Sequence, residues 1–167
     1  MSRIPGPRIF RSILCAVDFS SNSRAALRYA AMLARLSDAH LLVVYVNDPL
    51  IATAAATRPD AEAILGSTEN ELRRFVTAVV TKGTPSITTT LLTIAGKPSQ
   101  EIVKAAERHD CDLIVMGYRG VGRASRLLFG STTEGVVRAS GIPVLAVPPA
   151  RRRARLPIVR TGLRRVS

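Results

Sequence analysis

The sequence predicts a doubly wound α/β fold, in which a five-stranded parallel sheet carries helices on both faces. Five short apolar runs recur along the chain, and segments with the spacing of amphipathic helices lie between them. Strands that alternate with helices are joined by right-handed crossovers and therefore form a parallel sheet. The first run is continuously apolar rather than alternating, which is typical of a strand buried on both faces.

The five predicted strands take their bounds from composition and from the residues that stop them. The first is the apolar run that ends at Asp18, and the second is stopped by Asn47-Asp48-Pro49. The third is rich in threonine and β-branched residues, which favour strands. Short aliphatic runs predict the fourth and fifth strands. The expected bounds are 12–17, 40–46, 87–94, 113–116 and 144–147.

Four helices are predicted between these strands. The first, 24–36, is rich in alanine and can be capped by Ser20 or Ser21. The second follows a loop at 50–59 and runs from a cap at Asp60 to about residue 81. The third opens at Pro98, and the fourth covers 132–139. The inward face of the first helix is expected to consist of Leu27, Ala30, Ala31 and Ala34.

Length and composition predict one globular domain with two flanking segments. The chain has 167 residues and 47% hydrophobic residues, enough for a single core. We expect a flexible N-terminal arm at 1–10, a globular domain at 11–149 and an arginine-rich tail at 150–167. No apolar run is long enough to cross a bilayer, and the N-terminus lacks the apolar region of a secretory signal. A cytoplasmic location is therefore expected, with Cys15 and Cys111 as reduced core thiols.

The positive charge of the chain is concentrated in the tail. The net charge is +12, and residues 151–167 hold seven arginines and no acidic residue. The rest of the chain is therefore near +5, since 17 basic and 12 acidic residues remain. The tail is predicted to be disordered, with weak, nonspecific and salt-sensitive affinity for polyanions.

The motif that says most about function lies between the fourth strand and the last helix. Gly117-Tyr-Arg-Gly120 is followed, after nine residues, by Gly130-Ser131. Glycine lets the backbone approach an anion closely, and the free N–H groups of a helix's first turn point toward it. A strand, a glycine-bearing loop and a helix start therefore predict a phosphate site, and with it a nucleotide-binding protein.

Ser131 also has an interpretation that needs no ligand. The run Ser131-Thr-Thr-Glu134 fits a capping box, in which the serine and the glutamate satisfy N–H groups at the helix start reciprocally. The residues alone leave phosphate binding and capping open.

Asp18 ends the first predicted strand, at the edge of the sheet where doubly wound folds bind their ligands. Its carboxylate suits ribose hydroxyls or a metal ion, and a helix cap is the alternative. Arg119, Arg123 and Arg126 lie in or beside the glycine loop, where they either meet phosphates or face solvent.

Catalysis has little support in the sequence. His40 and His109 are expected at the amino ends of strands, so Ser131 lacks the base that a serine nucleophile usually has. The run from His109 to Asp112 is rich in metal-ligand types, but consecutive side chains cannot all converge on one ion. We interpret it as a helix end and the turn into a strand.

The glycine motif resembles the signature of the universal stress protein family, in particular its ATP-binding branch. The family pattern Gly-x2-Gly-x9-Gly-Ser/Thr is matched at Gly117, Gly120, Gly130 and Ser131. Further matches follow the order of the family at 13–20, 44–48, 96–98 and 143–147. The resemblance covers about residues 11–148.

The resemblance implies a sheet of strand order 3-2-1-4-5 and a homodimer paired through strand five. It also implies ATP as the bound nucleotide, with Mg²⁺ bridging phosphate oxygens. Asp18 would lie near the ribose and the Val46 backbone near adenine, while Met116 and Gly117 border the ribose and phosphates. The expected phosphate ligands are Gly120, Gly130, Ser131 and Thr132, and Arg119 of the same loop is added as a cation.

The function implied by the resemblance is that of a regulatory stress-response protein whose nucleotide occupancy alters the surface shown to partners. Two alternatives stay open. One is a slow ATPase or autophosphorylating enzyme with Ser131 or Thr132 as acceptor, and the other is a nucleic-acid-associated protein that acts through its tail. Two departures from the family are Tyr118, where a small residue is usual, and Tyr45, where histidine is frequent.

Overall fold

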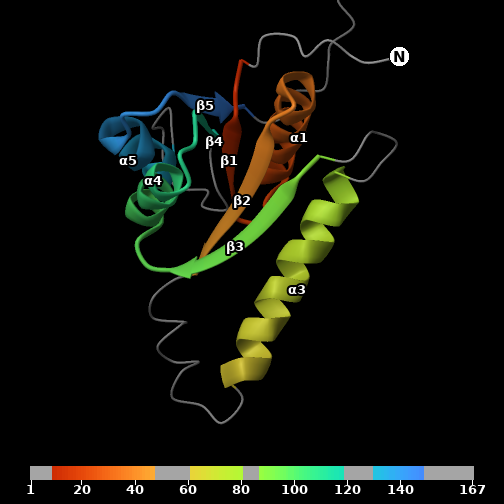
Figure 1. Cartoon of the computed structure of the whole chain (residues 1–167). Helices are drawn as coiled ribbons and strands as arrows, with labels where there is room; N and C mark the ends of the chain where they lie inside the picture. Colours follow the sequence, from red (N-terminus) through yellow and green to blue (C-terminus); the bar gives the residue numbers. More distant parts are fainter. Residues whose placement is uncertain (1–8, 48–60, 81–86, 119–129, 149–167) are drawn as a thin grey trace, which may run out of the picture.

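Five parallel strands form the centre of the computed structural model, which describes residues 9–47, 61–80, 87–118 and 130–148 (Figure 1). The sheet order is β3-β2-β1-β4-β5, and all four pairs of neighbours are parallel. This confirms the predicted doubly wound order. The strands are β1 (Ser12–Val17), β2 (His40–Asn47), β3 (Thr89–Ala95), β4 (Leu113–Gly117) and β5 (Val144–Val147).

Helices cover both faces of the sheet, as predicted (Figure 1). In the described ranges they are α1 (Ser21–Ser37), α3 (Ala61–Val80), α4 (Pro98–Arg108) and α5 (Ser131–Ala139). The core has two layers because successive strand residues point to opposite faces. Ile13 and Cys15 of β1 pack in the layer of α1 and α3, whereas Leu14 and Ala16 pack in the layer of α4 and α5.

The predicted element bounds agree closely with the observed ones. β1 and β5 have the expected limits, and β3 begins two residues later than expected. α1 starts at Ser21 rather than at residue 24, because the Ser20 hydroxyl caps it by accepting from Ser23 N. Its four predicted inward residues are all buried. Asp60, the loop at 50–59, residues 1–8 of the arm and the tail from residue 149 lie outside the described ranges.

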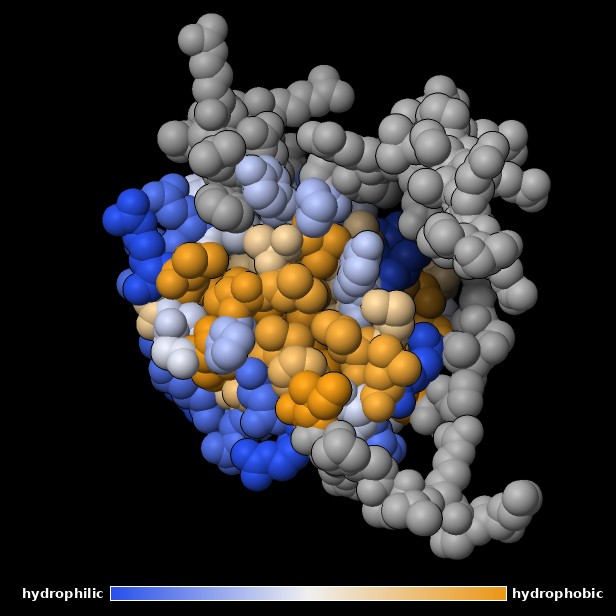
Figure 2. Space-filling model, turned by 90° about the horizontal axis from the view of Figure 1, so that it is seen from above, coloured by the Kyte–Doolittle hydropathy of each residue, from blue (hydrophilic) through white to orange (hydrophobic). Residues whose placement is uncertain are grey.

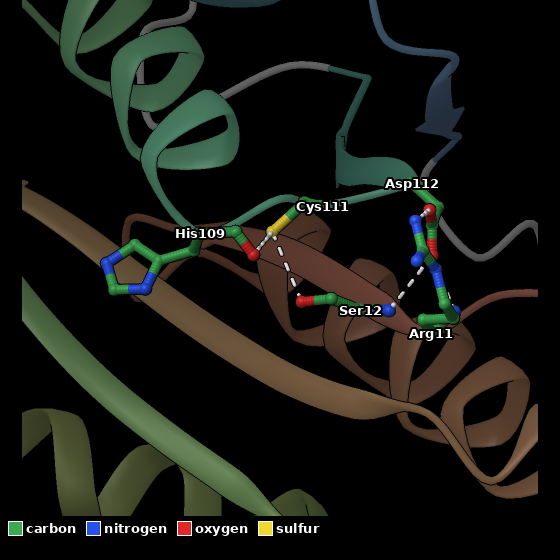
Figure 3. Close-up of polar contacts among 5 residues, drawn as sticks. All are labelled: Arg11, Ser12, His109, Cys111 and Asp112. Carbon is green, nitrogen blue, oxygen red and sulfur yellow. Dashed lines mark hydrogen bonds and ion pairs between the residues drawn. The ribbon is translucent and has the colours of Figure 1, made fainter.

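At the amino end of the sheet, one carboxylate joins two strands that are distant in sequence (Figure 3). Asp112 Oδ2 accepts hydrogen bonds from the backbone N–H groups of Arg11 and Ser12, and Asp112 Oδ1 lies 3.5 Å from Arg11 Nη2. The Arg11 backbone bond is the main cause that lowers the pKa of Asp112. We call these three residues the Asp112 clamp.

Beside the clamp, Cys111 Sγ lies 3.4 Å from Ser12 Oγ, and the ring of His109 points away from both (Figure 3). His109 is the C-cap of α4, and Asp110 has a φ of 47°, so the chain turns here from a helix into β4. The interpretation of residues 109–112 as a helix end and turn is confirmed.

Candidate functional site

Three of the predicted site residues meet at the carboxyl edge of the sheet. Val17 pairs with Tyr45, and Ala16 pairs with Met116. Asp18, Val46 and Gly117 are therefore placed at or just beyond the ends of three neighbouring strands, β1, β2 and β4. In doubly wound sheets this edge is where ligands bind.

Asp18 is held by the turn that leads into α1. Its carboxylate Oδ1 accepts a hydrogen bond from Ser20 N at 3.1 Å, and its backbone N–H donates to Ser23 Oγ at 3.3 Å. The Ser23 hydroxyl in turn donates to Ser20 O. Ser20, and not Asp18, is the N-cap of α1, so the interpretation of Asp18 as the helix cap is wrong. Its carboxylate instead braces the turn.

Gly117 lies against the first turn of the same helix. A Cβ atom at this position would come within 3.1 Å of the Asn22 carbonyl carbon and 3.2 Å of Ser23 N. Real Cβ atoms seldom approach backbone this closely, so glycine is what lets the end of β4 touch α1. Because Ser23 contacts both Asp18 and Gly117, these two predicted site residues are fixed relative to each other.

The start of α5 is joined to the end of β4 by two hydrogen bonds. The buried Thr133 hydroxyl donates to Gly117 O at 2.9 Å, and Gly130 N donates to Tyr118 O at 3.1 Å. Tyr118 is itself fixed to β5 through its N–H and Val147 O, at 2.7 Å. The first turn of α5 is therefore anchored at the carboxyl edge, next to Gly117.

The capping-box interpretation of Ser131 is wrong. Gly130 is the N-cap of α5, without a side-chain capping bond, and Ser131 is the first helical residue with an exposed side chain. Glu134 does not reach back to the helix start, because its carboxylate accepts from Arg138 at 2.8 Å one turn further on. A glycine cap has no side-chain oxygen for the N–H groups of the first turn, which suits them to an external acceptor.

The structure describes three of the remaining predicted site residues and leaves two outside its described ranges. Val46 is half-buried and packs in the layer of α4 and α5, where Met116 is buried. Thr132 is half-buried in the first turn of α5. Arg119 and Gly120, together with the neighbouring Arg123 and Arg126, lie outside the described ranges.

Several residues that shape this edge are not among the predicted site residues. Ser23 and Thr133 make the internal hydrogen bonds, and Phe19 packs its ring against Tyr45, with centroids 4.6 Å apart. Ser23 and Thr133 are the third residues of α1 and α5. A polar residue at this position is a signal that could have drawn attention to them, since the first helical turn needs hydrogen-bond partners. Burial raises the pKa of Tyr45, and the nearby charges of Glu71 and Asp18 raise it further.

Both cysteines are buried in the core. Cys15 is fully buried, and burial is the cause that raises its pKa well above the ordinary range. Burial also raises the pKa of Cys111.

Across the described ranges, no three His, Cys, Asp or Glu side chains gather closely enough to hold a metal ion. In the same ranges, no helix combines the length and apolarity needed to cross a membrane.

The fold is that of a doubly wound α/β protein, and its candidate site lies at the carboxyl edge formed by β1, β2, β4 and the start of α5. Within that class the chain belongs to the universal stress protein family, whose model matches residues 9–148.

Known proteins of the family cover nearly the whole of this fold. A universal stress protein of Thermus aquaticus is 33% identical in an alignment of 146 residues that covers 83% of this chain and 99% of the relative. Among solved structures, a Methanocaldococcus jannaschii protein has a TM-score of 0.69 at 24% identity, covering 86% of this chain and 99% of its own. The universal stress protein of Archaeoglobus fulgidus in complex with dAMP has a TM-score of 0.62 at 23% identity, with coverages of 83% and 98%.

Proposed function

We propose that this protein is an ATP-binding, dimeric regulator of the stress response, located in the cytoplasm, whose nucleotide occupancy changes the surface offered to partner proteins. The observation that carries the proposal is the arrangement at the carboxyl edge, where Asp18, Gly117 and the glycine-capped start of α5 are joined through Ser23 and Thr133. The Archaeoglobus relative binds dAMP, which supports an adenine nucleotide as the ligand.

In this proposal Asp18 binds the ribose. Its Oδ1 already accepts from Ser20 N, and the second carboxylate oxygen can accept a ribose hydroxyl. Hydrogen bonds to a charged acceptor are stronger than those between neutral groups, so this contact would contribute substantially to affinity. The Val46 backbone would border the adenine, and Met116 and Gly117 would border the sugar and the first phosphate.

The phosphates are proposed to meet the first turn of α5. Backbone N–H groups at a helix start and the helix dipole both favour an anion, and the exposed Ser131 hydroxyl and Thr132 add side-chain donors. Gly120 and Arg119 complete the proposed phosphate ligands. Mg²⁺ would be held by the phosphate oxygens and water, as is usual for nucleotide-borne magnesium, and would neutralise part of the phosphate charge.

The dimer is proposed to form through β5. This strand lies at the edge of the sheet, where its outer backbone groups can pair with another strand. Figure 2 views the molecule from the side of β5 and shows apolar side chains gathered on that face. Apart from Ile9, the exposed large apolar residues of the described ranges come from β5 and from the two helices that contact it: Tyr29, Met32 and Leu36 of α1, Val137 of α5 and Leu145 of β5.

The test of the site is Gly130→Val, measured by calorimetry with Mg-ATP. Gly130 has φ −69° and ψ 152°, an extended conformation that valine adopts without strain, so the variant should fold. Its side chain would stand at the start of α5, in the space proposed for phosphate, and ATP binding should be abolished. Gly141→Val is the matched control, because a Cβ there meets nothing within 4 Å, and it should bind like the wild type.

Normal ATP binding by Gly130→Val would reject the site, and wild-type protein that neither releases nucleotide on denaturation nor binds Mg-ATP would reject the function. Sedimentation of the same samples tests the dimer. We expect twice the 17.9 kDa of one chain, and a mass of one chain would reject pairing through β5.

A further inference from the structure

Phe19 has a backbone conformation that is unusual for its residue type. Its φ is 61°, in the left-handed region. The other non-glycine residues with positive φ in the described ranges are Asp38 and Asp110, and aspartate visits this region readily because its short side chain can bond locally. For a bulky residue the conformation costs about 1–2 kcal/mol, so contacts elsewhere must maintain it.

Aromatic packing supplies those contacts. The Phe19 ring lies 4.6 Å from the Tyr45 ring and 5.4 Å from the Phe75 ring, the latter in an edge-on arrangement at 81°. Aromatic pairs of this kind stabilise by about 0.5–1.5 kcal/mol each beyond their burial, enough to offset the strain. Phe75 belongs to α3, and the Arg24 guanidinium of α1 lies 4.6 Å from its ring centroid. The cluster therefore joins the turn after β1 to β2, α1 and α3.

The strained residue lies in the chain between Asp18 and the two serines that fix it. Asp18 N donates to Ser23 Oγ, and Ser20 N donates to Asp18 Oδ1. The left-handed bend at Phe19 is what turns the chain back so that Ser20 N reaches the carboxylate. Loss of that bend would release the carboxylate from its place at the sheet edge.

We propose that Phe19 is a positioning residue for ribose recognition: its packing on Tyr45 and Phe75 holds the Asp18 carboxylate where the ribose hydroxyls of the nucleotide are received. The inference rests on the proposed function and extends it, because α3 then influences the nucleotide site through Phe75. A change that loosens α3 weakens ribose recognition, and a bound nucleotide stabilises the packing of α3, since coupling between two sites is reciprocal.

The experiment compares ATP with 2′,3′-dideoxy-ATP, which lacks both ribose hydroxyls, by calorimetry at a temperature where all variants are folded. Wild-type protein should prefer ATP by about 10- to 100-fold, the effect of hydrogen bonds to a charged group. Phe19→Ala should lose most of this preference while its affinity for the dideoxy nucleotide stays nearly unchanged. Asp18→Ala should show the same collapse of the ratio.

Further variants separate the ring from the backbone strain. Phe19→Gly accepts the left-handed φ without strain but has no ring, and it should also lose the preference. Phe19→Tyr keeps the ring and should retain it. Phe75→Leu leaves the turn untouched and should reduce the preference several-fold. Gly66→Ala, on the same helix with nothing within 4 Å, should leave it unchanged.

Equal losses of affinity for both nucleotides would show that Phe19 acts only on stability, and this would overturn the inference. So would an unaltered preference in Phe19→Ala and Phe75→Leu while Asp18→Ala loses it, and the proposed function would then still stand. Wild-type protein that binds neither nucleotide would reject the proposed function and this inference with it.

Discussion

The two ends of the sheet use the same side chain in different ways. At the amino end, Asp112 accepts from the backbone of Arg11 and Ser12, about a hundred residues away, and so closes β1 onto the start of β4. At the carboxyl end, Asp18 accepts from Ser20, two residues away, and braces only its own turn. Asp112 therefore holds two strands together, whereas Asp18 braces a local turn at the edge where we propose that the ribose binds. The fold thus separates closure of the sheet from the proposed ligand site.

Crowding the carboxyl edge should have the largest effect on stability. In Gly117→Val, the new side chain would press on the backbone of Asn22 and Ser23, which cannot yield as a flexible side chain can. We expect a loss of about 3 kcal/mol in the free energy of unfolding, measured with urea, together with weaker nucleotide binding. Gly141→Val should change stability far less. An unchanged urea midpoint for Gly117→Val would mean that β4 and α1 do not meet as described.

Breaking the Asp112 clamp at the other end should cost about 2 kcal/mol, because Asp112→Ala removes the acceptor of two backbone N–H groups and the partner of Arg11. Unlike Gly117→Val, this change should leave nucleotide affinity unaltered, since the clamp lies at the far end of the sheet. A loss of affinity comparable to that of Gly117→Val would contradict the separation of the two ends.

The same clamp predicts how stability depends on acid. The folded pKa of Asp112 is lowered from its ordinary value of 3.8. The ionised carboxylate therefore contributes stability that is fully present above that pH and is lost as the pH falls through the folded pKa. Asp112→Asn should flatten this part of the stability profile below about pH 4. Equal acid sensitivity of the two proteins would assign the effect to other carboxylates.

The sequence was sufficient for the sheet because strands buried on both faces appear as continuous apolar runs, such as Ser12 to Val17. It also placed Asp18 and Gly117 at one edge, because the carboxyl ends of parallel strands share that edge. The aromatic cluster could not be predicted in this way. Phe19, Tyr45 and Phe75 are 26 and 30 residues apart in succession, and their contact depends on how α3 packs, which no local pattern specifies.

The serines near the starts of α1 and α5 differ in what their hydroxyl groups do, and the expected differences in stability are small. The sequence offers Ser20 and Ser21 as caps of the first helix and leaves Ser131 open between capping and phosphate binding, because the same residue types favour both roles. In the structure only Ser20 of these three caps a helix through its hydroxyl, whereas Ser21 and Ser131 are first helical residues with exposed side chains.

Ser20→Ala should therefore lower the free energy of unfolding by about 1 kcal/mol. Ser21→Ala and Ser131→Ala should each change it by less than about 0.5 kcal/mol. Thermal and urea unfolding measure these values, and calorimetry with Mg-ATP then separates the last two: Ser131→Ala should weaken nucleotide binding, and Ser21→Ala should not. If Ser131→Ala instead destabilised the protein as much as Ser20→Ala and left binding unchanged, Ser131 would be a structural residue and the phosphate site would have to be sought elsewhere.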